Sequence, residues 1–151
     1  TLAPALRLGW VVPPRRLYAD LVKLKRITDL GNPTLPQLAL ASLLGSGAFE
    51  RHLRHVRTRQ RQRRDAMLDE LRRRLPQATV HGVAAGLHLL VTLPDGADDA
   101  DLAQRALEAG LKVHPLSYHR QLPGPPGLVL GYAAQPPDRI REGVRRLADI
   151  S

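Results

Sequence analysis

Among the side chains of this sequence, histidine could bind a metal and arginine could bind an anion. The 151 residues contain six histidines and no cysteine, which excludes disulfides and thiolate metal sites. His52 and His55 are three residues apart, so on a helix they would share one face and could in principle bind zinc. No acidic residue or third histidine completes such a site at a persuasive spacing. Helix-surface histidines are therefore the preferred interpretation, and we expect no metal.

The formal net charge of +9 comes mainly from arginine and is densest at residues 57–64, RTRQRQRR. A basic helix of this kind can bind phosphates. Asp65, Asp69 and Glu70 follow it, however, and mixed charge along a helix is typical of a solvated or interdomain face, where acids pair with arginines one turn away. Nucleic-acid binding by this segment is the less favoured interpretation. Motifs typical of hydrolases and P-loop proteins do not occur.

Composition and length fit one globular domain. Apolar residues make up 43% and charged residues 25% of the chain. No apolar run approaches the 18 residues of a membrane span, and no basic-then-apolar start resembles a signal peptide. The absence of cysteine is compatible with a reducing compartment. We expect a cytoplasmic protein without a membrane partner.

The first half of the sequence predicts helices. Leu17, Leu21, Leu24 and Ile27 have helical spacing, and Gly31 with its neighbours ends that helix. The expected elements are a strand at 8–12, a helix at 15–30, a helix capped by Thr34 and ended at 45–47, and a long helix at 48–75.

The second half alternates strands and helices. The expected strands are 79–83, 87–93, 112–116 and 128–132, and the expected helices are 101–109, capped by Asp98 or Asp99, and 138–150. This order predicts an α/β fold with a mostly antiparallel sheet covered by helices and a long N-terminal linking helix. His114 and Tyr118 could approach an effector, although loop packing is the preferred interpretation for both.

Residues 2–10, LAPALRLGW, resemble the segment that follows the Schiff-base lysine in fold type I aminotransferases, which depend on pyridoxal 5'-phosphate (PLP). Arg7, Gly9 and Trp10 fit the arginine, glycine and aromatic positions of that pattern. Further short stretches resemble the family in order and spacing, most closely the MocR subgroup of GntR-type transcriptional regulators: LPQ at 35–37, GAFERHLRHVR at 47–57, RRD at 63–65, AGLH at 85–88, VHPLS at 113–117 and LGY at 130–132. The resemblance implies that 1–47 is the tail end of the PLP-binding large domain, 48–75 a connecting helix and 76–151 the small C-terminal α/β domain.

The resemblance also implies site residues. Arg7 would bind the phosphate of PLP, a task suited to a permanently charged guanidinium. Thr1 stands where the residue after the Schiff-base lysine should be, so the chain is expected to start one residue past it and to provide no catalytic residue. Lys23, Lys25 and Lys112 lie in predicted helices or strands that do not correspond to the position of the Schiff-base lysine. Val129 occupies the position at which aminotransferases carry an arginine for the substrate carboxylate.

The leading hypothesis is a fragment of a PLP-binding, effector-sensing domain of a GntR/MocR-type regulator. Its effector would be PLP or a small amino compound, its intact form a homodimer, and its contact with DNA would come from an N-terminal domain outside this chain. The alternative is a fragment of a PLP-dependent aminotransferase. A basic nucleic-acid-binding protein is the third hypothesis.

Overall fold

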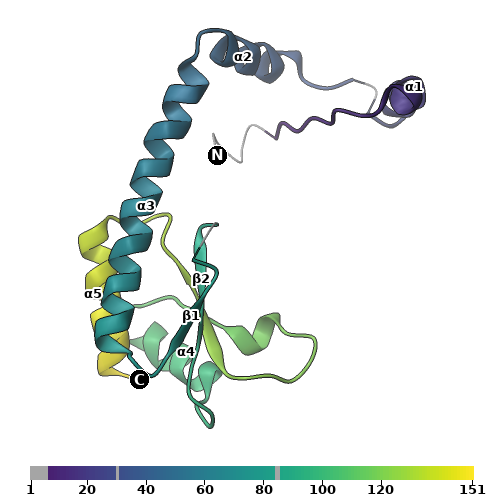
Figure 1. The fold of residues 1–151 in the computed structure, drawn as a ribbon. Helices are drawn as coiled ribbons and strands as arrows, with labels where there is room; N and C mark the ends of the chain where they lie inside the picture. The colour runs from purple at the N-terminus through teal and green to yellow at the C-terminus, as the bar shows by residue number, and fades with distance from the viewer. Residues whose placement is uncertain (1–6, 30, 84–85) are drawn as a thin grey trace. The chain divides into compact units, whose positions relative to one another are not determined.

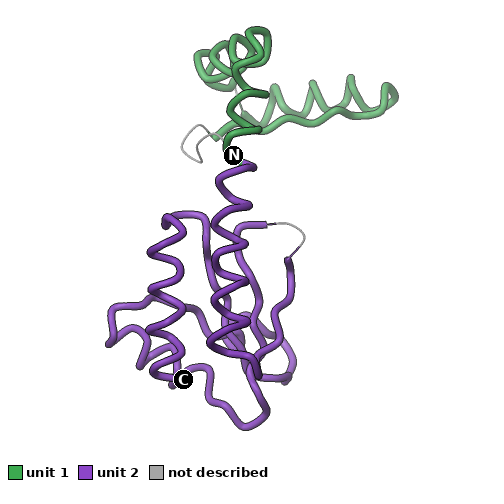
Figure 2. Tube along the Cα trace, turned by 60° about the vertical axis from the view of Figure 1, so that its left-hand side comes forward, with its two compact units in different colours: residues 1–56 green, residues 57–151 purple. Residues whose placement is uncertain are grey.

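The computed structural model describes residues 7–29, 31–83 and 86–151. It divides the chain into two compact units, Thr1–Val56 and Arg57–Ser151, drawn in different colours in Figure 2. The dividing point lies inside a long helix.

The first unit consists of helices joined by irregular segments. Helix α1 spans Arg15–Asp29, α2 spans Thr34–Gly45, and α3 begins at Ala48 (Figure 1). The strand expected at 8–12 is wrong: this segment is irregular, because a strand needs a partner for its backbone groups and no described strand pairs with it. Thr34 is also not the cap of α2. Pro33 holds that position, without any side-chain hydrogen bond.

The helices from α3 onward agree closely with the prediction. The long helix α3 covers Ala48–Arg74, α4 covers Asp99–Glu108 and α5 covers Pro137–Asp149. Asp98 caps α4 by accepting hydrogen bonds from the backbone N–H groups of Ala100 and Asp101, at 3.0 and 2.9 Å. Asp99, the alternative cap predicted from the sequence, does not cap this helix and has a different role.

The sheet has four strands in the order β1-β2-β4-β3, and every pair is antiparallel. The strands are β1 Thr79–His81, β2 His88–Thr92, β3 His114–Pro115 and β4 Gly127–Gly131. They are shorter than predicted. Strand β1 ends at His81 because Gly82 turns the chain with a φ of 77°. After β3 the chain forms a 3-10 helix, η2 Leu116–His119, in place of the last residue of the predicted strand.

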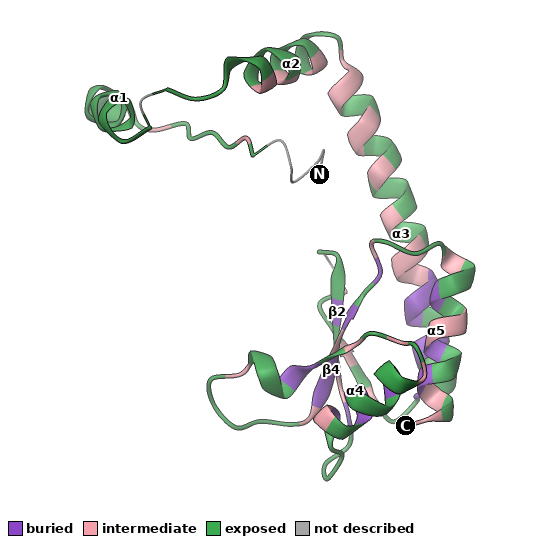
Figure 3. Cartoon of the chain, turned by 180° about the vertical axis from the view of Figure 1, so that it is seen from behind, coloured by how far each residue is buried: buried purple, intermediate pink, exposed green. Residues whose placement is uncertain are grey.

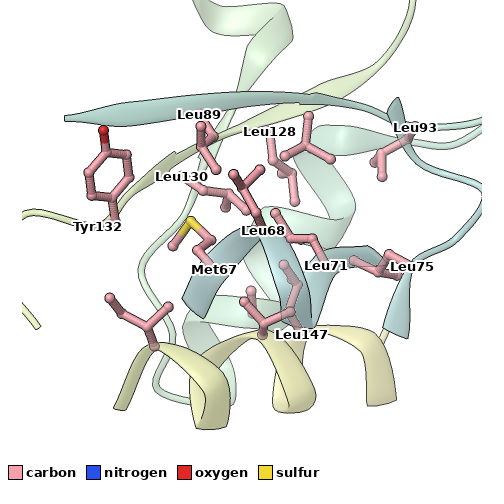
Figure 4. Close-up of a cluster of buried hydrophobic side chains, with 14 of the residues drawn as sticks. Met67, Leu68, Leu71, Leu75, Leu89, Leu93, Leu128, Leu130, Tyr132 and Leu147 are labelled. Carbon is pink, nitrogen blue, oxygen red and sulfur yellow. The ribbon is translucent and has the colours of Figure 1, made fainter. Parts of the chain in front are cut away.

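The core lies between one face of this sheet and helices α3, α4 and α5. In β2 and β4 buried and more exposed residues alternate, so that Leu89, Val91, Leu128 and Leu130 face the helices. Figure 4 shows these leucines opposite side chains of α3 and α5. The hydrophobic core contains fifteen buried residues, which are Met67, Leu68, Leu71, Leu75, Leu89, Val91, Leu93, Leu102, Ala106, Leu128, Leu130, Tyr132, Ile140, Val144 and Leu147. The predicted α/β fold with an antiparallel sheet and a long N-terminal helix is confirmed.

Burial differs sharply along α3. Its buried residues all lie between Ala66 and Leu71, as the change of colour along the helix in Figure 3 shows. The division into 1–47, 48–75 and 76–151 as parts of a large and a small domain stays a prediction. Among the described residues, no helix is long and apolar enough to cross a membrane.

Candidate cofactor-binding segment

Arg7 is exposed on an irregular segment, and its backbone is unusual. Its φ is 49°, the one positive value at a described residue other than glycine. Residues with a Cβ seldom adopt this conformation, and backbone strain of this kind is concentrated at ligand-binding sites. Among the described residues Arg7 makes no hydrogen bond or ion pair. The guanidinium is thus available to an anion from outside the chain.

The residues that follow Arg7 are exposed as well. Trp10, Val11 and Val12 are 74%, 72% and 87% exposed. A Cβ placed on Gly9 would meet nothing within 4 Å. Nothing in the described part of the chain therefore requires glycine at this position, and the match of Gly9 to the glycine of the family pattern stays a prediction.

Val129 and His114 lie together on the sheet face opposite the helices. Val129 is half-buried between two buried leucines of β4, so its side chain points away from the core. His114 of β3 is its register partner, and Leu90 of β2 lies across from it on the other side. The exposed ring of His114 contacts that of His119 edge-on, with centroids 6.1 Å apart. His114, His119 and Tyr118, the last at 76% exposure, are all exposed, and the preference for loop packing over an effector contact stays a prediction.

A buried carboxylate holds the loop that carries these rings. Asp99, only 4% exposed, accepts hydrogen bonds from the Ser117 hydroxyl at 2.6 Å, the Ser117 N–H at 3.0 Å and the Gly127 N–H at 2.9 Å. Burial alone would raise the pKa of Asp99, but these three hydrogen bonds and the charge of Arg120 outweigh it and lower the pKa below its ordinary value. Asp99 thus connects α4 to both ends of the segment 117–127.

Sequence reasoning missed this role of Asp99. The signal was present in the pair Asp98-Asp99, because one helix start needs one cap and the second carboxylate must find other donors. Which donors it finds depends on the fold, since Ser117 and Gly127 are 18 and 28 residues away.

The remaining candidates are possible metal ligands, the lysines, and the acidic residues near the basic run. No group of three or more histidine, aspartate or glutamate side chains suited to a metal occurs among the described residues. Lys23 and Lys25 lie on α1, where Lys25 pairs with Asp29 at 2.5 Å, and Lys112 is exposed before β3. Of the acidic residues near the basic run, Glu70 pairs with Arg73 and with Arg74, the latter at 3.0 Å, and Asp69 lies 3.9 Å from Arg72.

Known proteins of two kinds are similar to the chain over nearly its whole length. It is 32% identical over 97% of its residues to the "Probable rhizopine catabolism regulatory protein MocR" of Rhizobium meliloti, and covers 30% of that protein. It is 34% identical over 97% of its residues to the 2-aminoadipate transaminase of Thermus thermophilus, and covers 37% of it. The chain thus spans about a third of the curated relatives it matches. No family model matches it.

Solved structures give the same result for the fold. The chain superposes on a multiple substrate aminotransferase of Thermococcus profundus with a TM-score of 0.84, at 31% identity, over 99% of its own residues and 38% of that chain. It superposes on LysN, an α-aminoadipate aminotransferase of Thermus thermophilus solved with N-(5'-phosphopyridoxyl)-L-leucine, with a TM-score of 0.81 at 32% identity, over 97% of its own residues and 38% of that chain. The chain therefore has the fold of the C-terminal part of fold type I aminotransferases, and it is similar in sequence both to aminotransferases and to MocR-type regulators.

Proposed function

We propose that this chain is part of a PLP-binding, effector-sensing domain of a GntR/MocR-type transcriptional regulator. The single observation that carries the proposal is Arg7. It lies in a segment that resembles the family's phosphate-binding pattern, has a positive φ, and is exposed without a partner among the described residues. Relatives of the regulator class support the same assignment.

The residues of the chain fit one part of PLP. The cofactor supplies a phosphate dianion and an electrophilic aldehyde. The planar guanidinium of Arg7 suits the phosphate, because it offers several N–H donors and keeps its charge at all relevant pH values. No lysine of this chain adjoins the Arg7 segment, since Lys23 and Lys25 lie on α1 and Lys112 lies before β3. In our proposal the chain provides the phosphate contact, and the group that reacts with the aldehyde comes from elsewhere.

Val129 favours a sensor over an enzyme. A valine has no donors for the bidentate fork that an arginine makes with a carboxylate. Its register partner is His114, in ring contact with His119, so an amino-compound effector at this sheet face would meet imidazoles instead. The aminotransferase fragment stays the alternative, because transaminases are also similar to the chain. In that case the carboxylate contact would be made by another residue.

The partners in this proposal belong to a longer protein. A fold type I domain of the intact protein would form a homodimer, and an N-terminal winged-helix domain would bind DNA. The effector would be PLP or a small amino compound. It would change DNA binding only if its affinity differed between two domain arrangements, because a ligand shifts an equilibrium only through differential affinity.

The test is a PLP titration of a longer protein that includes this chain, with Arg7→Ala and Arg16→Ala compared. Both arginines are exposed and unpaired among the described residues, but Arg16 lies on α1 outside the family pattern. We expect Arg7→Ala to lose a charged phosphate contact worth about 1.5–3 kcal/mol, roughly a 10- to 150-fold weaker Kd, and Arg16→Ala to match the unchanged protein. Equal PLP affinity for both variants would remove Arg7 from the site.

A second arm separates the regulator from the enzyme. We expect the same longer protein to bind one DNA site with an affinity that PLP or an amino compound changes, and to turn over amino acids poorly. Rapid transamination without any DNA binding would favour the alternative instead.

A further inference from the structure

A cleft of about 610 Å³ opens in the second unit, beside α5. One wall is the segment 110–113, which links α4 to β3. The opposite wall is the α5 face that carries Arg139, Gly143 and Arg146 at helical spacing, and Met67 and Leu130 contribute to the apolar floor. Arg146 donates a hydrogen bond to the Ala109 carbonyl across one end of the cleft. All lining residues belong to the second unit, so the cleft does not depend on the proposed cofactor contact.

Two cations that line this cleft, Lys112 and Arg139, differ from the paired arginines of α5. Arg141 pairs with Asp138 at 2.7 Å and Arg145 with Glu142 at 2.7 Å. Among the described residues, Arg139 and Lys112 have no hydrogen bond or ion pair, and both line the cleft. Glu142, the one carboxylate of the lining, is already bound to Arg145. The cleft therefore presents unneutralised positive charge above an apolar floor.

Gly143 lines the cleft, and its backbone conformation does not require glycine. It lies inside α5, where glycine is less favourable than alanine, and its φ is not in the left-handed region. A Cβ at this position would make an ordinary contact of 3.7 Å with Leu111 Cδ2, so alanine would fit. A larger side chain would project into the space between α5 and the 110–113 segment.

We propose that this cleft binds a small organic anion with a compact apolar group, such as an aromatic carboxylate. Arg139 and Lys112 would neutralise the anion, since charge-assisted hydrogen bonds are the strongest available to an exposed carboxylate. Met67 and Leu130 would contact the apolar group. The site lies apart from Arg7 in the chain and takes no part in binding PLP phosphate in our account.

The test uses the 151-residue chain and three probes: phenylacetate, phenylacetamide without the charge, and acetate without the ring. Backbone amide signals of Gly110, Gly131 and Gly143, all in the lining, report binding by NMR. We expect saturable shifts at these glycines with phenylacetate, and binding at least about tenfold weaker for each of the other two probes. Equal binding of phenylacetamide or of acetate would overturn the proposal, as would the absence of saturable shifts.

Substitutions of residues that line the cleft test whether phenylacetate binds there. We expect Arg139→Gln and Lys112→Gln each to weaken phenylacetate binding about three- to tenfold, and Gly143→Leu to abolish it. Arg141→Gln, on the same helix but paired with Asp138 outside the cleft, is the matched control and should change binding less than about twofold. Should Gly143→Leu fail to fold, the two charge variants still decide. Equal effects of Arg139→Gln and Arg141→Gln would contradict the site.

Discussion

The two units of this chain use apolar residues in opposite ways. Among the residues that the structure describes, all buried ones lie in Arg57–Ser151 and none lies in the first unit. The first unit does not lack apolar side chains. On α1 the periodic residues Leu17, Leu21, Leu24 and Ile27 are 43%, 37%, 59% and 66% exposed.

The difference shows that a segment can have the pattern of a helix without packing that helix into a core. An amphipathic pattern is enough to predict α1 and α2, but most helical stability in proteins comes from tertiary packing of the apolar face. In the second unit the faces of α3, α4 and α5 have a sheet to cover. In the first unit the corresponding faces have no such partner among the described residues.

The largest expected effect is that of core truncation in the second unit. Leu128→Ala removes a fully buried side chain, 0% exposed in β4, and should cost about 2–5 kcal/mol of the free energy of unfolding. Leu38→Ala, at 61% exposure in α2, should change it by less than about 0.5 kcal/mol. Urea denaturation of the whole chain measures both. A comparable loss for Leu38→Ala would mean that the first unit has a core of its own.

The next effect concerns the segment held by Asp99. Asp99→Ala leaves the Ser117 and Gly127 N–H groups without an acceptor, and we expect a loss of about 2–4 kcal/mol in the free energy of unfolding. Asp101→Ala is the control, because Asp101 is exposed and pairs with Arg105 at the surface, where such a pair is worth about 0–1 kcal/mol. Equal losses would show that Asp99 contributes no more than a surface pair.

The pH dependence of stability follows from the same carboxylate. The pKa of Asp99 is lowered in the folded state, so ionised Asp99 stabilises the fold fully above the ordinary aspartate pKa. This contribution is lost as the pH falls through the lower folded-state value. We therefore expect the stability of the unchanged chain to fall in acid more than that of Asp99→Ala, measured by denaturation at pH 7 and at about pH 3.

The smallest effect is expected for DNA. Of the basic run 57–64, Arg63 donates a hydrogen bond to the Ala133 carbonyl and Arg64 bonds Asp65 at 2.8 Å. Arg57, Arg59 and Arg61 are exposed. Three phosphate contacts predict a log–log salt slope of roughly −3 and no sequence preference. A filter-binding series over salt concentration measures it. Hundredfold discrimination of one operator from scrambled DNA would favour the nucleic-acid-binding hypothesis over the sensor.

Periodicity predicted most of the fold. The helices α1, α3, α4 and α5 and all four strands were expected close to their observed positions, because the spacing of apolar residues and the Gly and Pro positions mark them directly. Strand ends were less well predicted, as at Gly82. The strand predicted at 8–12 is not observed. An apolar run such as Trp10–Val12 predicts a buried strand, but no described strand pairs with this segment.

The candidate site was predictable only through resemblance. A lone arginine among twenty carries no signal of its own, and Arg7 stands out by its neighbours Gly9 and Trp10. Interactions over long sequence separations stayed hidden, as in the Asp99 contact with Gly127 and the register of Val129 with His114. Both depend on strand pairing, which periodicity does not specify.

Amide hydrogen exchange tests the proposal that residues 1–47 are the tail end of a PLP-binding large domain. In the 151-residue chain, we predict that amides of α1 and α2 exchange nearly unprotected, while those of β2 and β4 exchange only through global unfolding. In a longer protein with PLP bound, amides of α1 and α2 should become protected. Strong protection of α1 and α2 in the 151-residue chain, or none in the longer protein, would contradict the account.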